Sequence, residues 1–153
     1  MSEHWGKKLV TDSHELIDAA KYLRDFALAA EQSAVNGIKI HSTVPMQSFL
    51  LQSDRCRRFE LVISQLVASA IARSIGGNIG IELMHEADFV HCEVSNYGSE
   101  GSSAVPGLEC AHQLAKALRG RIGHWFDRET TSLVLTVPLT ERERQANRVL
   151  RAD

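Results

Sequence analysis

The sequence predicts a two-layer α/β sandwich of the α+β class, in which helices cover one face of a mixed sheet and a further helix precedes it. Two observations lead to this fold class. Apolar residues recur at helical spacing in three segments, and apolar and polar residues alternate in five shorter ones. Four of these five short segments form two pairs separated by brief turns, so hairpins rather than single strands alternate with helices. The length of 153 residues suits one hydrophobic core.

The first predicted helix spans residues 12–36. Asp12 followed by Glu15 resembles a capping box, and apolar residues repeat at helical spacing from Leu16 onward. Gly37 suits the left-handed position that closes a helix. The apolar stripe of this helix must be covered, either by the sheet of the same domain or by a second copy of the helix in a dimer.

Residues 38–44 alternate with period two and predict a strand, and residues 45–52 predict a loop. The longest predicted helix follows at 53–74, capped by Ser53 or Asp54. Burying its wide apolar face at about 1.5–3 kcal/mol per side chain makes this helix a main source of stability. The face consists of Phe59, Val62, Ile63, Leu66, Val67, Ala70 and Ile71.

The second half of the chain repeats a hairpin, a helix and a hairpin. The predicted elements are strands at 79–83 and 90–94 joined by a turn at 86–88, a Gly/Ser-rich loop at 96–106, a helix at 108–118, strands at 122–126 and 133–137, and a charged tail with helical character at 141–153.

Composition excludes several classes of function. A formal net charge of -2 provides no general basic field for nucleic acid, and no apolar run approaches the length that spans a bilayer. Cys56, Cys92 and Cys110 show no CxxC spacing, and the seven histidines form no HxxxH or HExxH pattern. We therefore expect a cytoplasmic protein without disulfides, metal, nucleic acid or membrane partner.

Four segments together match motifs of a known family. They are QLVASAIARS at 65–74, VSNYGS at 94–99, GLECAH at 107–112 followed by Leu114-Ala115 and Leu118-Arg119-Gly120, and SLVLTVPL at 132–139. They resemble the ELVxNAxKHA, VxDNGxG and GLGLxxxxxLAxxLGG motifs and the closing strand of the ATPase domain shared by histidine kinases, anti-sigma-factor kinases, DNA gyrase and Hsp90. The resemblance covers about residues 33–139.

This resemblance implies a domain organisation. Residues 1–36 would form an N-terminal helix and candidate dimerisation element, 37–140 a histidine-kinase-like ATPase domain, and 141–153 a charged tail. It also implies where a nucleotide site would lie. The corresponding positions are Gln65, Ser69, Arg73, Ser95, Asn96, Gly98 and Gly107.

The same comparison implies a weakened nucleotide site. Gln65 stands for the family's Glu, Ser69 for its magnesium-binding Asn, and Ser95 for its adenine-binding Asp. A hydroxyl is a poorer magnesium ligand than an amide oxygen, and Ser95 is too short to replace the Asp. Glu109 replaces a Gly where backbone amides would approach phosphate. Arg73 is the one compensating cation.

Kinases of this family also carry a phosphoacceptor histidine on a two-helix dimerisation segment. Residues 13–16, SHEL, resemble the start of that helix, so His14 is the candidate phosphoacceptor. The segment lacks the Arg-x-Pro that follows in the family, and this chain has room for one such helix only. An ordinary exposed histidine is the competing interpretation.

Three functions remain open from the sequence. The first is a bacterial signal-transduction protein of two-component or phosphorelay type, with a degenerate kinase domain. It would act by protein binding or phosphotransfer on a response-regulator receiver domain or another signalling protein, as a homodimer and without a cofactor. The second is an active ATP- and magnesium-dependent histidine kinase or anti-sigma-factor Ser/Thr kinase. The third is a regulatory domain that binds a small molecule in the vacated cleft.

Overall fold

The computed structural model describes residues 14–33, 37–45, 47–73, 77–97, 107–127 and 130–152. Its elements in chain order are β1 (Leu16–Asp18), α2 (Ala19–Ser33), β2 (Lys39–Thr43), β3 (Leu50–Gln52), α3 (Ser53–Arg73), β4 (Asn78–His85), β5 (Phe89–Tyr97), α4 (Glu109–Ala117), β6 (Arg121–Asp127), β7 (Thr130–Pro138) and α5 (Glu141–Arg151).

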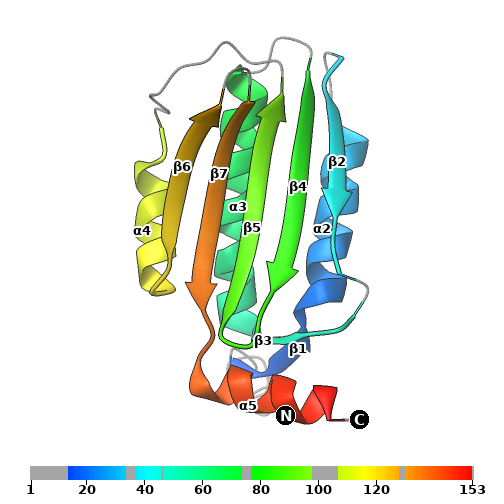
Figure 1. Cartoon of the computed structure of the whole chain (residues 1–153), viewed down its shortest axis with the longest axis vertical. Coiled ribbons are helices and arrows are strands. Elements are labelled where there is room, and N and C mark those ends of the chain that lie inside the picture. Colours follow the sequence, from blue (N-terminus) through cyan, green and yellow to red (C-terminus); the bar gives the residue numbers. More distant parts are fainter. Residues whose placement is uncertain are drawn as a thin grey trace, which may run out of the picture.

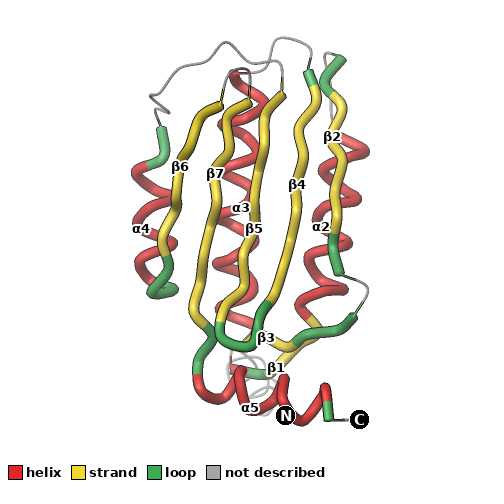
Figure 2. The backbone as a smooth tube through the Cα atoms, viewed as in Figure 1, coloured by secondary structure: helices red, strands yellow, loops and turns green. Residues whose placement is uncertain are grey.

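The main sheet has five strands in the order β2-β4-β5-β7-β6. Strands β2 and β4 are parallel, and the other neighbours are antiparallel. Helices α2, α3 and α4 lie together on one side of this sheet, as Figures 1 and 2 show. The predicted two-layer sandwich with a mixed sheet is therefore confirmed, as are both hairpins.

Helix α3 crosses the centre of the core. Its buried residues are Cys56, Phe59, Val62, Ile63, Leu66, Val67 and Ala70, and Ile71 packs half-buried beside them. Apart from Cys56, these are the residues that the helical spacing assigned to the core. None of the helices in the described part of the chain is both long and apolar enough to cross a membrane.

The predicted start of the first helix is wrong. Residues 16–18 form strand β1, and α2 begins at Ala19, where Asp18 Oδ1 accepts hydrogen bonds from the Ala20 and Lys21 amides at 3.1 and 3.4 Å. Asp18 is thus the observed N-terminal cap. Asp12, the predicted cap, lies outside the described residues. Strand β1 escaped prediction because three residues are too few to show an alternating pattern.

The predicted loop at 45–52 contains strand β3, which pairs antiparallel with β1 in a separate two-stranded sheet. This small sheet lies at the end of the molecule beside α5 (Figure 1). Pairing places Ile17 opposite Leu51, and Leu51 is buried in the core. The strand forms because a partner distant in sequence satisfies its backbone, which local composition does not reveal.

Part of the apolar stripe of α2 is buried by the same domain, whereas Phe26 and Ala30 are only partly buried. Ala19, Ala20, Leu23 and Ala27 are buried against the core. Polar contacts fix the helix beside β2, because the Glu31 carboxylate accepts hydrogen bonds from the Ser42 amide and hydroxyl at 2.9 and 2.8 Å. The elements of the same domain, one of the two predicted covers, therefore bury the four residues Ala19, Ala20, Leu23 and Ala27.

The charged C-terminal segment forms helix α5, which docks onto β3. Thr140 and Glu143 form a reciprocal capping box at its start. Glu143 Oε2 accepts a hydrogen bond from the Gln52 amide at 2.8 Å, and Asn147 bonds both backbone groups of Leu50 at 2.7 and 2.9 Å. The edge of β3 is therefore closed by side chains of α5 rather than by another strand.

Candidate functional site

Three predicted site residues lie in a row along α3. Gln65, Ser69 and Arg73 are spaced four residues apart, which places them on one face of the helix. Gln65 Nε2 donates a hydrogen bond to Cys110 Sγ of α4 at 3.5 Å. The row therefore faces α4, on the side of α3 where the resemblance implies a nucleotide cleft.

Arg73 ends this row. Its Nε donates to the Ser69 carbonyl oxygen at 3.4 Å, and its Nη1 is buried without a hydrogen-bond partner among the described residues. Burial lowers the pKa of the guanidinium, but arginine starts so far above neutrality that it stays charged. The cleft thus has a fixed positive charge at the C-terminal end of α3.

Strand β5 presents Asn96, not Ser95, to the cleft. Asn96 is 1% exposed and its Nδ2 donates to the Ala70 carbonyl oxygen of α3 at 3.1 Å. Ser95 points to the other face of the sheet, where its hydroxyl lies 3.2 Å from that of Ser132. Adjacent residues of a strand face opposite sides, so only Asn96 joins the α3 row. The predicted loop began at Asn96, whereas β5 continues through Tyr97.

Thr131 is a cleft residue that the sequence interpretation missed. It pairs with Asn96 across β5 and β7, is 1% exposed, and carries a buried Oγ1 without a hydrogen-bond partner among the described residues. The alternation along β7 was a usable signal, because Leu133, Leu135 and Val137 face the core and Thr131 continues their series.

The start of α4 forms the remaining wall that the structure describes. Gly107 has a φ of 83°, a left-handed conformation that favours glycine. Leu108 follows as a cap without a side-chain hydrogen bond, and Glu109 places an exposed carboxylate in the first turn. The carboxylate interacts favourably with the positive end of the helix dipole, where a phosphate would otherwise bind.

Of the predicted site residues that the structure describes, Ser95 and His14 do not join this group. Gly98 lies outside the described residues. His14 is exposed and precedes β1, so it is not on helix α2, contrary to the predicted helix at 12–36. Strand β1 lies at the opposite end of the molecule from the C-terminus of α3 (Figure 1).

The cleft combines a cation, two amides and two hydroxyl groups. The cation is Arg73, the amides are Gln65 and Asn96, and the hydroxyls are Ser69 and Thr131. Within the described ranges, no group of three or more His, Cys, Asp or Glu side chains could hold a metal ion. Such a set can donate and accept hydrogen bonds, but it contains no acid or base suited to proton transfer.

Comparison with solved structures identifies the fold. The chain superposes on histidine kinase ThkA in complex with response regulator TrrA, with a TM-score of 0.68, 17% identity, and coverage of 92% of this chain and 48% of that one. For Acinetobacter baumannii histidine kinase AdeS the TM-score is 0.63 and the identity 18%, over 83% of this chain and 68% of that one. For the isolated catalytic domain of ThkA the TM-score is 0.64 and the identity 16%, over 82% of this chain and 96% of that one.

Neither a family model nor a curated protein matches the sequence. At identities of 14–18% the likeness shows the fold alone. The chain covers about half of the ThkA chain in its complex and nearly all of the isolated catalytic domain. It therefore has the fold of the histidine kinase ATPase domain, which confirms the fold implied by its motifs.

Proposed function

We propose that this chain is a signal-transduction protein of two-component or phosphorelay type whose ATPase domain has lost its magnesium-ATP chemistry and acts through a protein partner. One observation carries the proposal. The polar side chains that face the cleft bond the protein itself: Gln65 bonds Cys110, Asn96 bonds the Ala70 carbonyl, and Arg73 bonds the Ser69 carbonyl. These hydrogen bonds stabilise the fold. A nucleotide at the same place would need polar side chains that are not already bonded to the protein.

The residues present do not fit magnesium-ATP. Mg²⁺ prefers a set of oxygen ligands, usually including carboxylates. The α3 row offers one hydroxyl, at Ser69, and the guanidinium of Arg73 lies one turn away, where it would repel a cation. Glu109 adds a negative charge at the start of α4, where phosphate groups would approach. No catalytic step through ATP is assigned to this site.

A response-regulator receiver domain is the partner class that we propose. One structurally similar kinase, ThkA, was solved in complex with response regulator TrrA, which is a fact about that protein. The proposal includes a homodimer through residues 1–36 and a cytoplasmic location. Free thiols at Cys56, Cys92 and Cys110 fit a reducing compartment.

An active kinase is the alternative, whether a histidine kinase or an anti-sigma-type Ser/Thr kinase. The buried Thr131 Oγ1 and Arg73 Nη1 favour it, because neither atom has a hydrogen-bond partner among the described residues. Buried polar atoms are rarely left unpaired, so both could bond a ligand in the cleft. Magnesium-ATP titration of the wild type and of Thr131→Val separates the two functions, because the alternative requires binding that the variant weakens.

Binding to purified receiver domains tests the proposal directly. Isothermal titration calorimetry should show saturable binding to at least one receiver domain of the same organism. Absence of binding to every receiver domain would remove this partner class.

Phosphotransfer is tested separately with a receiver domain that carries labelled phosphoaspartate. If His14 is the carrier, label appears on the wild type and on the control His124→Ala, which alters another exposed histidine, but not on His14→Ala. Label that never moves leaves protein binding as the only form of the proposal, and label that still reaches His14→Ala removes His14 as the carrier.

A further inference from the structure

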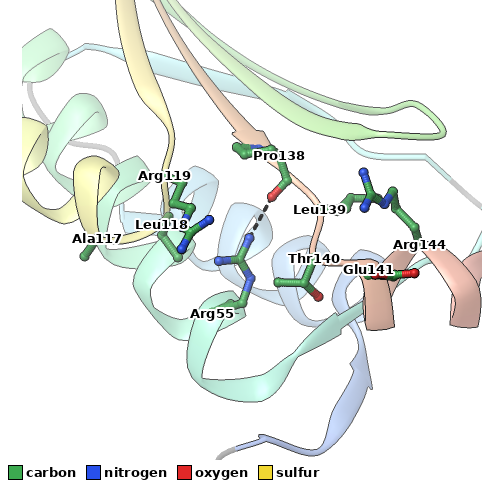
Figure 3. Close-up of a pocket in the computed structure, with 9 residues that line it drawn as sticks. All are labelled: Arg55, Ala117, Leu118, Arg119, Pro138, Leu139, Thr140, Glu141 and Arg144. Carbon is green, nitrogen blue, oxygen red and sulfur yellow. Dashed lines mark hydrogen bonds between the residues drawn. The ribbon is translucent and has the colours of Figure 1, made fainter.

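A cavity lies at the other end of the fold from the row of Gln65, Ser69 and Arg73. It has a volume of about 490 Å³ and is formed where the first turn of α3, the C-terminus of α4, the end of β7 and the first turn of α5 meet (Figure 3). Its lining residues include Arg55, Leu118, Arg119, Leu139, Thr140 and Arg144. This volume is in the range of small-molecule sites in proteins.

The cavity carries an excess of positive charge. Arg55, Arg119 and Arg144 line it, and Glu141 is the one acid among the lining residues. Arg55 is fixed by Glu143, 3.2 Å from its Nε, and by the Pro138 carbonyl oxygen, 2.8 Å from its Nη2. The side chains of Arg119 and Arg144 form no hydrogen bond or ion pair within the described part of the chain.

Arg119 occupies an unusual backbone position. Its φ of 57° makes it the one non-glycine residue with a positive φ among the described residues. It closes α4, with its amide donating to the Lys116 carbonyl at 2.9 Å and the Gly120 amide donating to that of Ala115 at 2.8 Å. Glycine is the usual residue here, and the family pattern LGG has it at this point.

The strained position directs a charge into the cavity. Figure 3 shows the Arg119 side chain extending toward Arg55, while the Arg144 side chain runs from α5 past Leu139, with its guanidinium away from those of Arg55 and Arg119 in this view. Arg55 already has Glu143 as its counter-charge, so Arg119 and Arg144 are the lining cations that a bound anion would neutralise. An arginine at a left-handed position is also more costly than the glycine it replaces, which points to a role for its guanidinium.

From these observations we propose that the cavity formed by Arg55, Arg119 and Arg144 binds the phosphate group of a phosphorylated small molecule. Guanidinium groups bind phosphate oxygens in pairs, which a single lysine cannot do. The apolar side chains of Leu118 and Leu139 offer contact area for the rest of the ligand. The N-terminus of α5 contributes little to anion binding, because the capping box already bonds the backbone amides of Thr140 and Glu143.

Pyrophosphate titration monitored by calorimetry and by ³¹P NMR tests this site. The wild-type protein should bind pyrophosphate saturably. Arg119→Gly should weaken binding about tenfold or more, because it removes a charged hydrogen-bond donor. The same change relieves the strained φ, so the variant should unfold at the same temperature as the wild type or higher. Arg144→Gln should also weaken binding, whereas Arg121→Gln, which alters an exposed arginine outside the cavity, should not.

The site is overturned if the wild type shows no saturable binding at millimolar pyrophosphate, or if both Arg119→Gly and Arg144→Gln bind as tightly as the wild type. Binding that is lost in Arg73→Ala but kept in Arg119→Gly would assign the anion to the cleft between α3 and α4 instead. Pyrophosphate binding and receiver binding are measured separately, so the failure of one leaves the other proposal standing.

Discussion

Asn96 of β5 donates a hydrogen bond from Nδ2 to the carbonyl oxygen of Ala70 in α3, over 3.1 Å, and both residues are buried. The bond ties the central strand of the sheet to the central helix, at a position where the sequence motifs imply a nucleotide site. A carboxylate at this position could not donate, so an amide suits a structural bond better than an aspartate would.

Changing Asn96 to Asp should therefore destabilise the protein by about 2–4 kcal/mol at neutral pH, because a buried carboxylate would face a carbonyl oxygen. Burial raises the pKa of an introduced carboxyl, so the folded state would keep its proton at a pH where the unfolded state loses it. Stability of Asn96→Asp relative to wild type should thus fall as the pH rises from 4 to 8. Urea unfolding of the wild type and of Asn96→Asp at pH 4 and pH 8 measures this difference in stability. A difference that does not change with pH would contradict the assigned bond.

Glu143 should be among the most sensitive positions of the chain. Its side chain is fully buried and accepts hydrogen bonds from Arg55 Nε and from the amides of Gln52 and Thr140. Glu143→Ala leaves Arg55 without its partner and should cost about 3–5 kcal/mol. The exposed Glu141 is the matched control, and Glu141→Ala should change stability by less than about 0.5 kcal/mol. Equal effects of the two variants in thermal unfolding would show that α5 is not docked as described.

The turn between α4 and β6 requires glycine at position 120. A Cβ there would lie 2.6 Å from the Thr136 carbonyl oxygen and 2.8 Å from Val137 Cγ2. Gly120→Ala should cost about 1–3 kcal/mol through this overlap. The control is Gly123→Ala in β6, where the nearest atom lies 3.9 Å from the added Cβ. Chemical denaturation of both variants checks the difference, and a Gly120→Ala protein as stable as Gly123→Ala would be inconsistent with the close approach.

The three cysteines should differ sharply in reactivity. Burial raises the pKa of Cys56 and of Cys92 to about 12, whereas Cys110 is exposed on α4. Thiolate is the reactive form, so alkylation of the native protein should modify Cys110 alone, as peptide mapping would show. Above the ordinary thiol pKa of 9.0 the unfolded state releases protons that the folded state keeps, so stability should decrease there. Rapid labelling of Cys92 in native protein would contradict its burial.

The sequence predicted the fold well where periodicity is long. The apolar spacing from Phe59 to Ile71 located α3, and the two hairpins follow from alternation of at least five residues. Strands β1 and β3 escaped prediction because each has three residues and depends on a distant partner. The docking of α5 through Glu143 and Asn147 also escaped, because buried polar residues are indistinguishable from surface ones in a sequence.

The candidate site was predicted less completely than the fold. The row of Gln65, Ser69 and Arg73 follows from helical spacing alone. The choice between Ser95 and Asn96 depends on where β5 ends, and the boundaries of elements are poorly specified by sequence. Alternation along β7 could have assigned Thr131 to the core face, but its place opposite Asn96 depends on the register between β5 and β7, which only the structure provides.

Titration of the wild-type protein with magnesium-ATP by calorimetry is the most direct test of the central claim. A cleft whose side chains bond Cys110, Ala70 and Ser69 should give no saturable heat at millimolar nucleotide that depends on Mg²⁺ or that is lost in Thr131→Val or Arg73→Ala. Saturable, magnesium-dependent binding that is weakened in Thr131→Val or Arg73→Ala would contradict the account and make the chain an ATP-binding kinase domain.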